Sequence, residues 1–172
     1  MKIWYLRIKK PSANSMERIA IFPGSFDPFT LGHKIVVDDG LKLFDKIIIG
    51  VGINTTKQGL LPVEKRMELI ADLYTGEPRI EVMTYDGLTV EFARNVGAKY
   101  ILRGMRNSVD FEFERNMMQV NQALHPEIMT VLLFTPPQYV AISSSFVREI
   151  YAFGGDTAQF MPEGIDLEKY LK

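Results

Sequence analysis

Short apolar runs alternate with amphipathic helical patterns along the chain from Arg18 onward. The apolar runs are rich in isoleucine and valine and nearly continuous in hydrophobicity, which is typical of strands buried on both faces of a sheet. The predicted strands are 19–22, 46–51, 79–84, 100–102 and 129–134. The predicted helices are 32–44, 63–74, 89–96 and 109–124, another that follows Ser144, and a short one from Leu167. This alternation predicts an α/β fold: a single doubly wound, Rossmann-like domain with a five-stranded parallel sheet.

The composition of the chain excludes several kinds of chemistry. The 172 residues include no cysteine, so a disulfide scaffold, a thiolate nucleophile and a cysteine-based metal centre are excluded. Lysine and arginine number 20 against 21 aspartate and glutamate residues, and a duplex-binding domain carries a basic excess that this chain lacks. No apolar run approaches the roughly 20 residues that a membrane span needs. We therefore expect a cytoplasmic protein that has neither nucleic acid nor a membrane as its partner.

A boundary is visible near Met16, where Pro-Ser-Ala-Asn-Ser separates a short N-terminal segment from the patterned body of the chain. This segment could add an edge strand, form a disordered tail, or be upstream sequence that precedes a true start at Met16. We expect residues 1–17 to be a dispensable extension and residues 18–172 to form the domain.

A rigid turn follows the first predicted strand. It lies at the carboxyl ends of the strands, where doubly wound proteins bind their ligands. It contains two prolines, two glycines and an aspartate, and the next helix opens at Gly32 and His33. A helix N-terminus presents free N–H groups and the positive end of the helix dipole, so this turn is suited to phosphate. Ser25 adds a hydroxyl group and His33 adds an imidazole. The alternative interpretation is a tight structural turn with Thr30 as the helix cap and a surface histidine.

Two arginines lie at the end of the fourth predicted strand. Arg103 and Arg106 flank a glycine just past the strand, and a planar guanidinium group matches phosphate oxygens bidentately. The two side chains could instead pair with Asp110, Glu112 or Glu114.

Three consecutive serines, residues 143–145, open an amphipathic helix near the C-terminus. They offer hydroxyl groups and free N–H groups to an anion, although helix capping alone accounts for one or two of them. Other polar residues are interpreted as structural: Asp27 and Asp39 in turns or on the surface, Arg66 on a helix surface or in a subunit contact, and His125 before a proline.

The string GSFDPFTLGH, residues 24–33, resembles the signature of the nucleotidyltransferase superfamily, whose T/H-x-G-H motif binds the triphosphate of a nucleotide. Thr30 stands at the first position of the motif, as in the phosphopantetheine adenylyltransferase family. The loop that carries Lys57, the segment 101–114 and the segment 136–150 are similar to that family in the same order. The resemblance runs from Arg18 to the C-terminus and leaves out the first 17 residues.

The resemblance implies an enzyme of coenzyme A synthesis that transfers the adenylyl group of ATP to 4′-phosphopantetheine. It assigns transition-state stabilisation to His33 and further catalytic contacts to Lys57 and Arg106. The residues implied to bind ATP are Ser25, Phe26, His33, Gly104, Met105, Arg106, Glu114, Tyr139, Val140, Ala141, Ile142, Ser143, Ser144 and Ser145. Those implied to bind the phosphopantetheine acceptor are Ser25, Lys57, Leu88, Thr89, Arg103, Met117 and Asn121.

The resemblance also implies Mg²⁺ as the cofactor and a homohexamer, a dimer of trimers, as the assembly. The ion is expected on ATP oxygens and water, because the sequence shows no carboxylate cage. Three alternatives stay open. The chain could be another nucleotidyltransferase, of the nicotinamide mononucleotide adenylyltransferase or cytidylyltransferase type. It could be a regulatory module that binds the nucleotide without turnover, or a flavodoxin-like electron carrier, which fits the strand order but leaves the basic residues unexplained.

Overall fold

The computed structural model describes residues 17–53 and 59–171, and five strands within them form one parallel sheet. The strands are β1 (Ile19–Gly24), β2 (Lys46–Gly52), β3 (Ile80–Tyr85), β4 (Tyr100–Met105) and β5 (Met129–Phe134). The α-helices are α1 (Leu31–Gly40), α2 (Val63–Leu73), α3 (Thr89–Asn95), α4 (Ser108–Leu124) and α5 (Ser144–Ala152). Short 3₁₀ helices are η1 (Pro137–Tyr139), η2 (Ala158–Phe160) and η3 (Leu167–Tyr170). The predicted fold class, a doubly wound α/β domain with five parallel strands, is confirmed.

The strand order is β3-β2-β1-β4-β5, and it reverses between β1 and β4. This is the order of nucleotide-binding doubly wound sheets, whereas flavodoxin-like sheets follow the order 2-1-3-4-5. The flavodoxin-like alternative is therefore wrong. Ligands of doubly wound sheets bind beyond the carboxyl ends of the strands at this reversal, which here lies after Gly24 of β1 and Met105 of β4.

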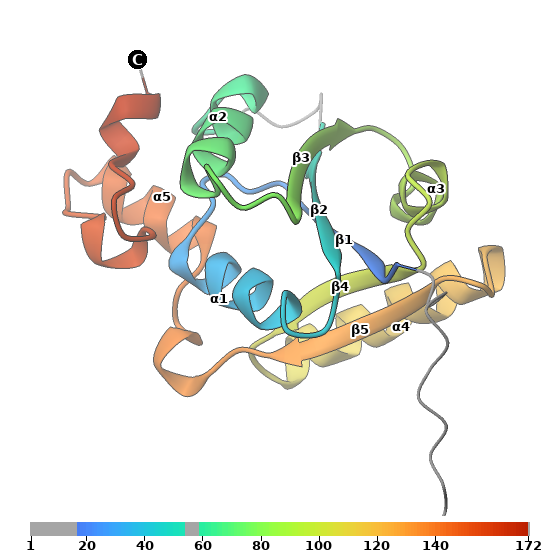
Figure 1. Cartoon of the computed structure of the whole chain (residues 1–172). Coiled ribbons are helices and arrows are strands. Elements are labelled where there is room, and N and C mark those ends of the chain that lie inside the picture. The colour runs from blue at the N-terminus through green and yellow to red at the C-terminus, as the bar shows by residue number, and fades with distance from the viewer. Residues whose placement is uncertain (1–16, 54–58, 172) are drawn as a thin grey trace, which may run out of the picture.

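Two apolar clusters cover the two faces of the sheet. One contains Val37 of α1, Leu69 of α2 and Val147 of α5, and the other contains Val90 of α3 and Ile101 of β4. Figure 1 shows the sheet with α1, α2 and α5 on one side and α3 and α4 on the other. The central strands β1 and β2 are buried on both faces, as expected, whereas the edge strands β3 and β5 are partly exposed. The sheet edges therefore depart from the continuous burial that the sequence pattern predicts.

Helix α1 ends at Gly40, earlier than predicted, because the chain turns back there toward β2 and the N–H of Phe44 donates to the Gly40 carbonyl. A Cβ at Gly40 would lie 2.6 Å from Leu102 and 2.9 Å from Ile47. Glycine therefore lets α1 approach the sheet closely.

Strand β4 runs to Met105, beyond its predicted end, so Arg103 and Gly104 lie within the strand rather than past it. In the described part of the chain, no helix is long and apolar enough to cross a membrane. Residues 1–16 lie outside the described residues, so the dispensable N-terminal extension stays a prediction.

Candidate active site

The turn between β1 and α1 gathers three phenylalanines around one histidine. Phe26 has a positive φ of 48° and is buried, and a Cβ at Gly24 would lie 2.7 Å from its ring. The rings of Phe26 and Phe29 lie 5.2 and 5.3 Å from the imidazole of His33, centroid to centroid. Phe22 of β1 lies 6.3 Å from the same imidazole. These contacts hold His33 on the first turn of α1, so it is not the surface histidine of the alternative interpretation.

His33 is a neutral hydrogen-bond donor at neutral pH. Its Nδ1 accepts the N–H of Thr30, the N-cap residue of α1, at 3.0 Å. This bond assigns the ring proton to Nε2. Burial lowers the pKa of His33 to about 4, and the positive charges of Arg106 and Arg103 contribute to this lowering. The ring therefore offers one N–H group to a ligand without carrying a charge.

Both arginines at the end of β4 pair with acidic residues of α4. Arg103 donates from Nε to Oε2 of Glu114 at 2.8 Å, from Nη2 to Oε1, and from Nη1 to the carbonyl of Pro23 at 2.6 Å. Arg106 donates from Nε to Oδ2 of Asp110 at 2.9 Å, and the hydrogen bonds from Arg106 lower the pKa of Asp110. Two of the three acidic partners that the sequence left open are thus occupied. The pairs hold the guanidinium groups in fixed orientations at the end of the strand.

The three serines at the start of α5 have three different partners. Ser143 is the N-cap residue of α5. Ser144 donates from Oγ to the carbonyl of Pro28 at 2.8 Å, which joins α5 to the turn after β1. Ser145 accepts from Nη2 of Arg148 at 3.2 Å. Capping therefore accounts for Ser143, Ser144 connects the helix to the turn after β1, and Ser145 bonds to Arg148 within α5.

Two adjoining cavities open at the carboxyl ends of the strands. The larger, of about 440 Å³, is lined by Phe22, Pro23, Gly24, Ser25, Phe26, Thr30, Gly32, His33, Val36, Arg103, Gly104, Arg106, Asp110, Phe113, Glu114, Thr135, Ile142, Ser143, Ser144, Ser145 and Arg148. The smaller, of about 320 Å³, is lined by Pro23, Gly24, Ser25, Gly52, Ile53, Tyr85, Asp86, Gly87, Thr89, Ile101, Arg103, Phe113, Glu114, Met117, Met118, Asn121 and Thr130. Ser25, Arg103 and Glu114 line both cavities and mark their boundary.

Apart from Ser25, Arg103 and Glu114, which line both cavities, the residues predicted to bind ATP and those predicted to bind the acceptor line different cavities where they line one at all. The predicted ATP-binding residues that line the larger cavity are Ser25, Phe26, His33, Gly104, Arg106, Glu114, Ile142, Ser143, Ser144 and Ser145. Met105 is buried in the core, and Tyr139, Val140 and Ala141 lie outside the lining. The predicted acceptor-binding residues that line the smaller cavity are Ser25, Thr89, Arg103, Met117 and Asn121, whereas Leu88 is exposed beside it. Lys57 lies outside the described residues.

Strand β3 and helices α3 and α4 form part of the wall of the smaller cavity. Tyr85 stacks on Phe92 with ring centroids 4.6 Å apart, and its hydroxyl group lies 3.2 Å from Oγ1 of Thr89. Met117 and Asn121 face this wall from α4, and the side chain of Asn121 is buried. The cavity therefore combines the aromatic ring of Tyr85 with the thioether of Met117 and the amide of Asn121. Arg103 lies at its boundary with the larger cavity.

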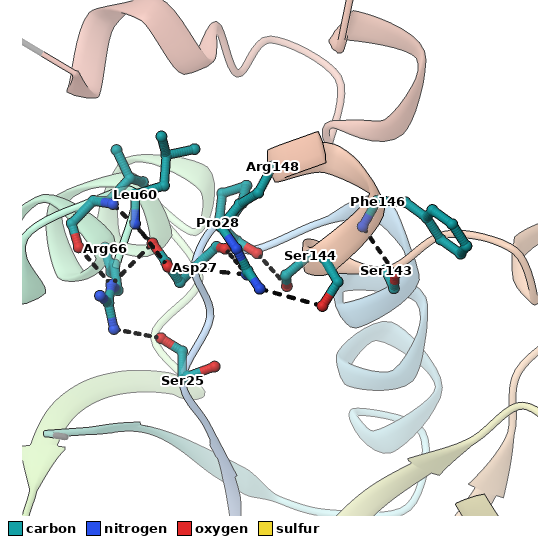
Figure 2. A network of polar contacts seen from close by, with 11 residues as sticks. Ser25, Asp27, Pro28, Leu60, Arg66, Ser143, Ser144, Phe146 and Arg148 are labelled. Carbon is teal, nitrogen blue, oxygen red and sulfur yellow. Dashed lines mark hydrogen bonds and ion pairs between the residues drawn. The ribbon is translucent and has the colours of Figure 1, made fainter. Parts of the chain in front are cut away.

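Sequence reasoning missed a buried network behind the larger cavity. Asp27 lies in a turn, as interpreted, but Asp27 and Arg66 are both buried, so their interpretation as surface residues is wrong. Figure 2 shows both side chains in one network with Arg148, which lines the larger cavity and which the sequence did not single out. A usable signal was the spacing of Arg148 three residues after Ser145, which places both on one helical face.

Comparison with known proteins shows the family of this chain. Residues 21–150 match the cytidylyltransferase-like family model. The chain is 49% identical over 150 residues to a phosphopantetheine adenylyltransferase of Bacteroides thetaiotaomicron, covering 87% of this chain and 99% of that protein. It is 43% identical over 157 residues to the one of Lacticaseibacillus casei, covering 91% of this chain and 94% of that protein. The chain belongs to the phosphopantetheine adenylyltransferase family.

A more distant likeness concerns the fold of the family alone. A bifunctional NMN adenylyltransferase/ADP ribose pyrophosphatase from Francisella tularensis superposes with a TM-score of 0.64 at 17% sequence identity. The superposition covers 85% of this chain and 45% of that protein. The phosphopantetheine adenylyltransferase fold is thus shared with an adenylyltransferase of different sequence.

Proposed function

We infer that this chain is an enzyme that transfers the adenylyl group of ATP to 4′-phosphopantetheine, giving 3′-dephospho-coenzyme A and pyrophosphate. Its relatives at 43–49% identity carry the name of this activity. The observation that carries the inference is the pair of cavities that share Ser25 and Arg103. One cavity offers a neutral imidazole and two helix N-termini to a triphosphate, and the other offers a partly apolar channel to a pantetheine arm.

The acceptor brings its own nucleophile in this reaction. An oxygen of the phosphopantetheine phosphate attacks the α-phosphorus of ATP in line, and the bond from that phosphorus to the α–β bridging oxygen breaks. Pyrophosphate leaves with the bonding electrons. The protein mainly positions two anions and stabilises the negative charge that spreads over the α-phosphate. We assign that stabilisation to the Nε2–H of His33, which donates to an α-phosphate oxygen.

The remaining contacts divide between the two anions. Arg106 and the serines 143–145 hold the β- and γ-phosphates at the N-terminus of α5. Ser25 and Arg103 hold the acceptor phosphate at the boundary of the cavities, and Lys57 is proposed to contact the same phosphate. In-line transfer requires the attacking oxygen to approach the α-phosphorus from the side opposite the leaving group.

We propose that Mg²⁺ accompanies ATP as the cofactor. Among the residues that the structure describes, no group of three or more His, Asp or Glu side chains is placed to hold a metal ion. The carboxylates that line the larger cavity, Asp110 and Glu114, are both paired with arginines. The described residues thus do not supply a ligand set, and triphosphate oxygens and water would hold the ion. When bound, Mg²⁺ neutralises part of the triphosphate charge.

We also propose that the enzyme is cytoplasmic and assembles as a homohexamer, a dimer of trimers. Helix α4 and strand β5 expose large apolar side chains: Val109, Phe111, Phe113, Val120, Leu124, Met129 and Phe134. Extended apolar patches on a soluble protein mark surfaces that another molecule covers. Sedimentation equilibrium is expected to give the mass of a hexamer, and a monomeric mass at micromolar concentration would overturn the assembly.

The decisive experiment detects pyrophosphate release with ATP, Mg²⁺ and 4′-phosphopantetheine. Parallel reactions contain nicotinamide mononucleotide or glycerol 3-phosphate as the acceptor. Release with phosphopantetheine alone is the expected result. Release with another acceptor would overturn the substrate assignment while keeping the nucleotidyltransferase chemistry. If no pyrophosphate is released with any of the three acceptors although the protein binds ATP, the result would favour a regulatory module that binds the nucleotide without turnover.

A further inference from the structure

Asp27 joins the turn after β1 to the segment that leads into α2. Its side chain is 8% exposed, and its two carboxylate oxygens accept from two successive main-chain N–H groups. Oδ2 accepts from Leu60 at 2.9 Å and Oδ1 accepts from Leu61 at 2.8 Å. A buried carboxylate needs such partners to offset the loss of water. The bonds therefore fix the position of the turn relative to the start of α2.

Two arginines flank the same carboxylate. Arg66 is 8% exposed, and its Nε lies 3.4 Å from Oδ1 of Asp27. The same arginine donates to the carbonyl of Ser25 at 3.2 Å. On the other side, Nη1 of Arg148 lies 3.9 Å from Oδ2 of Asp27 and donates to its carbonyl at 2.6 Å. One carboxylate thus lies between two guanidinium groups, and Figure 2 shows how they extend in opposite directions from it.

Both arginines connect Asp27 to the lining of the cavities. Arg66 contacts Ser25, which lies at the boundary of the two cavities. Arg148 itself lines the larger cavity and contacts Ser145 at the start of α5. Asp27 does not belong to the lining of either cavity. Its effect on a ligand must therefore act through the groups that it holds.

The space around the carboxylate is tightly closed. A Cβ at Gly59 would lie 2.0 Å from Nη2 of Arg66 and 2.7 Å from Oδ2 of Asp27. Both side chains are held by hydrogen bonds: Arg66 donates from Nε to the carbonyl of Leu61 at 2.8 Å, and the Asp27 carboxylate accepts from Leu60 and Leu61. A side chain introduced at Gly59, which lines neither cavity, would therefore displace the carboxylate or Arg66.

We propose that Asp27 is a positioning residue for the nucleotide site, holding Arg148 and the start of α5 against the turn after β1. The proposal rests on the proposed function in taking the larger cavity as the ATP site. The carboxylate fixes the turn, and the carbonyl groups of Asp27 and Pro28 on that turn accept from Arg148 and Ser144. Displacement of the turn removes both acceptors at once, so the triphosphate end of the cavity loses its shape.

The test replaces the carboxylate by a near-isosteric amide. Asp27→Asn removes the charge between the arginines and turns an N–H donor toward Leu60 or Leu61. ATP binding is measured by calorimetry without an acceptor, and the Kd is expected to rise about tenfold, the usual effect of losing one charge-assisted contact. Asp39→Asn is the matched control, because Asp39 pairs with Lys42 on the surface of α1. Its Kd is expected to stay unchanged.

Calorimetry separates positioning from a merely structural role. A structural role lowers the stoichiometry of binding and the melting temperature, but the folded fraction keeps the wild-type Kd. That outcome would overturn the proposal. If Asp27→Asn does not fold, Gly59→Ala perturbs the same carboxylate and is expected to raise the Kd about threefold through a partial loss of the contact. An unchanged Kd in folded Gly59→Ala would then overturn it.

A double-mutant cycle identifies the route through Arg148. Adding Asp27→Asn to Arg148→Gln is expected to raise the Kd by a smaller factor than Asp27→Asn does alone, because the contact of Arg148 is already lost and only that of Ser144 remains. If the fold-changes in Kd of the two substitutions multiply, they act independently, and Asp27 does not act through Arg148. A wild-type chain that binds ATP but transfers nothing would refute the proposed function alone, since the Kd comparison needs no transfer.

Discussion

The two cavities that meet at Ser25 and Arg103 present different chemistry to their ligands. The larger is bordered by the N-termini of α1 and α5 and by the imidazole of His33, whereas the smaller is bordered by Tyr85 and by Met117 of α4. Hydrogen-bond donors stabilise charge that develops during a reaction, but apolar contacts bind the ground state and the transition state alike. We therefore expect changes in the larger cavity to lower kcat or ATP affinity, and changes in the smaller to raise the KM for the acceptor.

The largest effect is expected at His33. His33→Ala removes a donor to the α-phosphate, and the loss of such a donor lowers kcat by about 10²–10³. ATP affinity should change little, because the donor acts on charge that appears in the transition state. Steady-state kinetics together with ATP calorimetry measure both quantities. The control is His125→Ala, since His125 bridges Glu91 and Glu127 away from both cavities. A fall in ATP affinity equal to the fall in kcat/KM would contradict the assigned role.

A change at the boundary should affect the acceptor. Arg103→Ala removes a guanidinium group from the proposed site of the acceptor phosphate, and the KM for phosphopantetheine is expected to rise about 10- to 100-fold. The KM for ATP should rise much less. Arg94→Ala, on the exposed face of α3, controls for loss of an arginine. An unchanged KM for phosphopantetheine would place the acceptor phosphate elsewhere.

Most of the fold could be predicted from the sequence, because burial on both faces leaves a pattern that is local in the chain. The continuous apolar runs of β1 and β2 correspond to strands that are buried throughout. The ends of the helices and strands were harder to predict from the sequence. Gly40 ends α1 where the helix meets Leu102, and the end of β4 depends on its pairing with β5, so both limits depend on residues distant in sequence.

The site was predictable where one segment carries several reactive groups, as in the turn from Ser25 to His33. The partners of those groups were not. Asp27 bonds to Leu61, 34 residues away, and to Arg148, 121 residues away. A local pattern contains no information on such pairs, so an aspartate in a turn is read as exposed. The resemblance likewise assigns Glu114 to ATP without indicating that it holds Arg103.

Glu114 therefore has two possible roles that kinetics can separate. It pairs bidentately with Arg103, so Glu114→Gln should loosen that guanidinium group and raise the KM for phosphopantetheine about tenfold. A direct contact with the adenosine of ATP would instead raise the KM for ATP. Glu112→Gln on the same helix is the matched control, because Glu112 pairs with Arg115 on the surface. A rise confined to the KM for ATP would refute the positioning of Arg103.

A smaller effect is expected inside the second cavity. Met117 is 40% exposed, so Met117→Ala removes a partly buried apolar contact and should raise the KM for phosphopantetheine about threefold. Both kcat and the KM for ATP should keep their wild-type values. Gln122→Ala, an exposed change on the same helix, gives the baseline. A fall in kcat of the same size would show that this cavity also acts in the transition state.

The smallest effect concerns the charge of His33. With its pKa lowered to about 4 by burial and by Arg106 and Arg103, the imidazole stays neutral at pH 6 and above. Lowering the pH from 8 to 6 should therefore leave the ratio of the ATP Kd of His33→Gln to that of the wild type constant within about twofold. Protonation of ATP itself cancels in this ratio. With the ordinary histidine pKa of about 6.5, the wild type would gain a positive charge over this range and bind the triphosphate more tightly. The ratio would then rise several-fold toward pH 6. A rising ratio would show that His33 holds ATP as a cation in the ground state, and the larger cavity would lose the transition-state role that separates it from the smaller one.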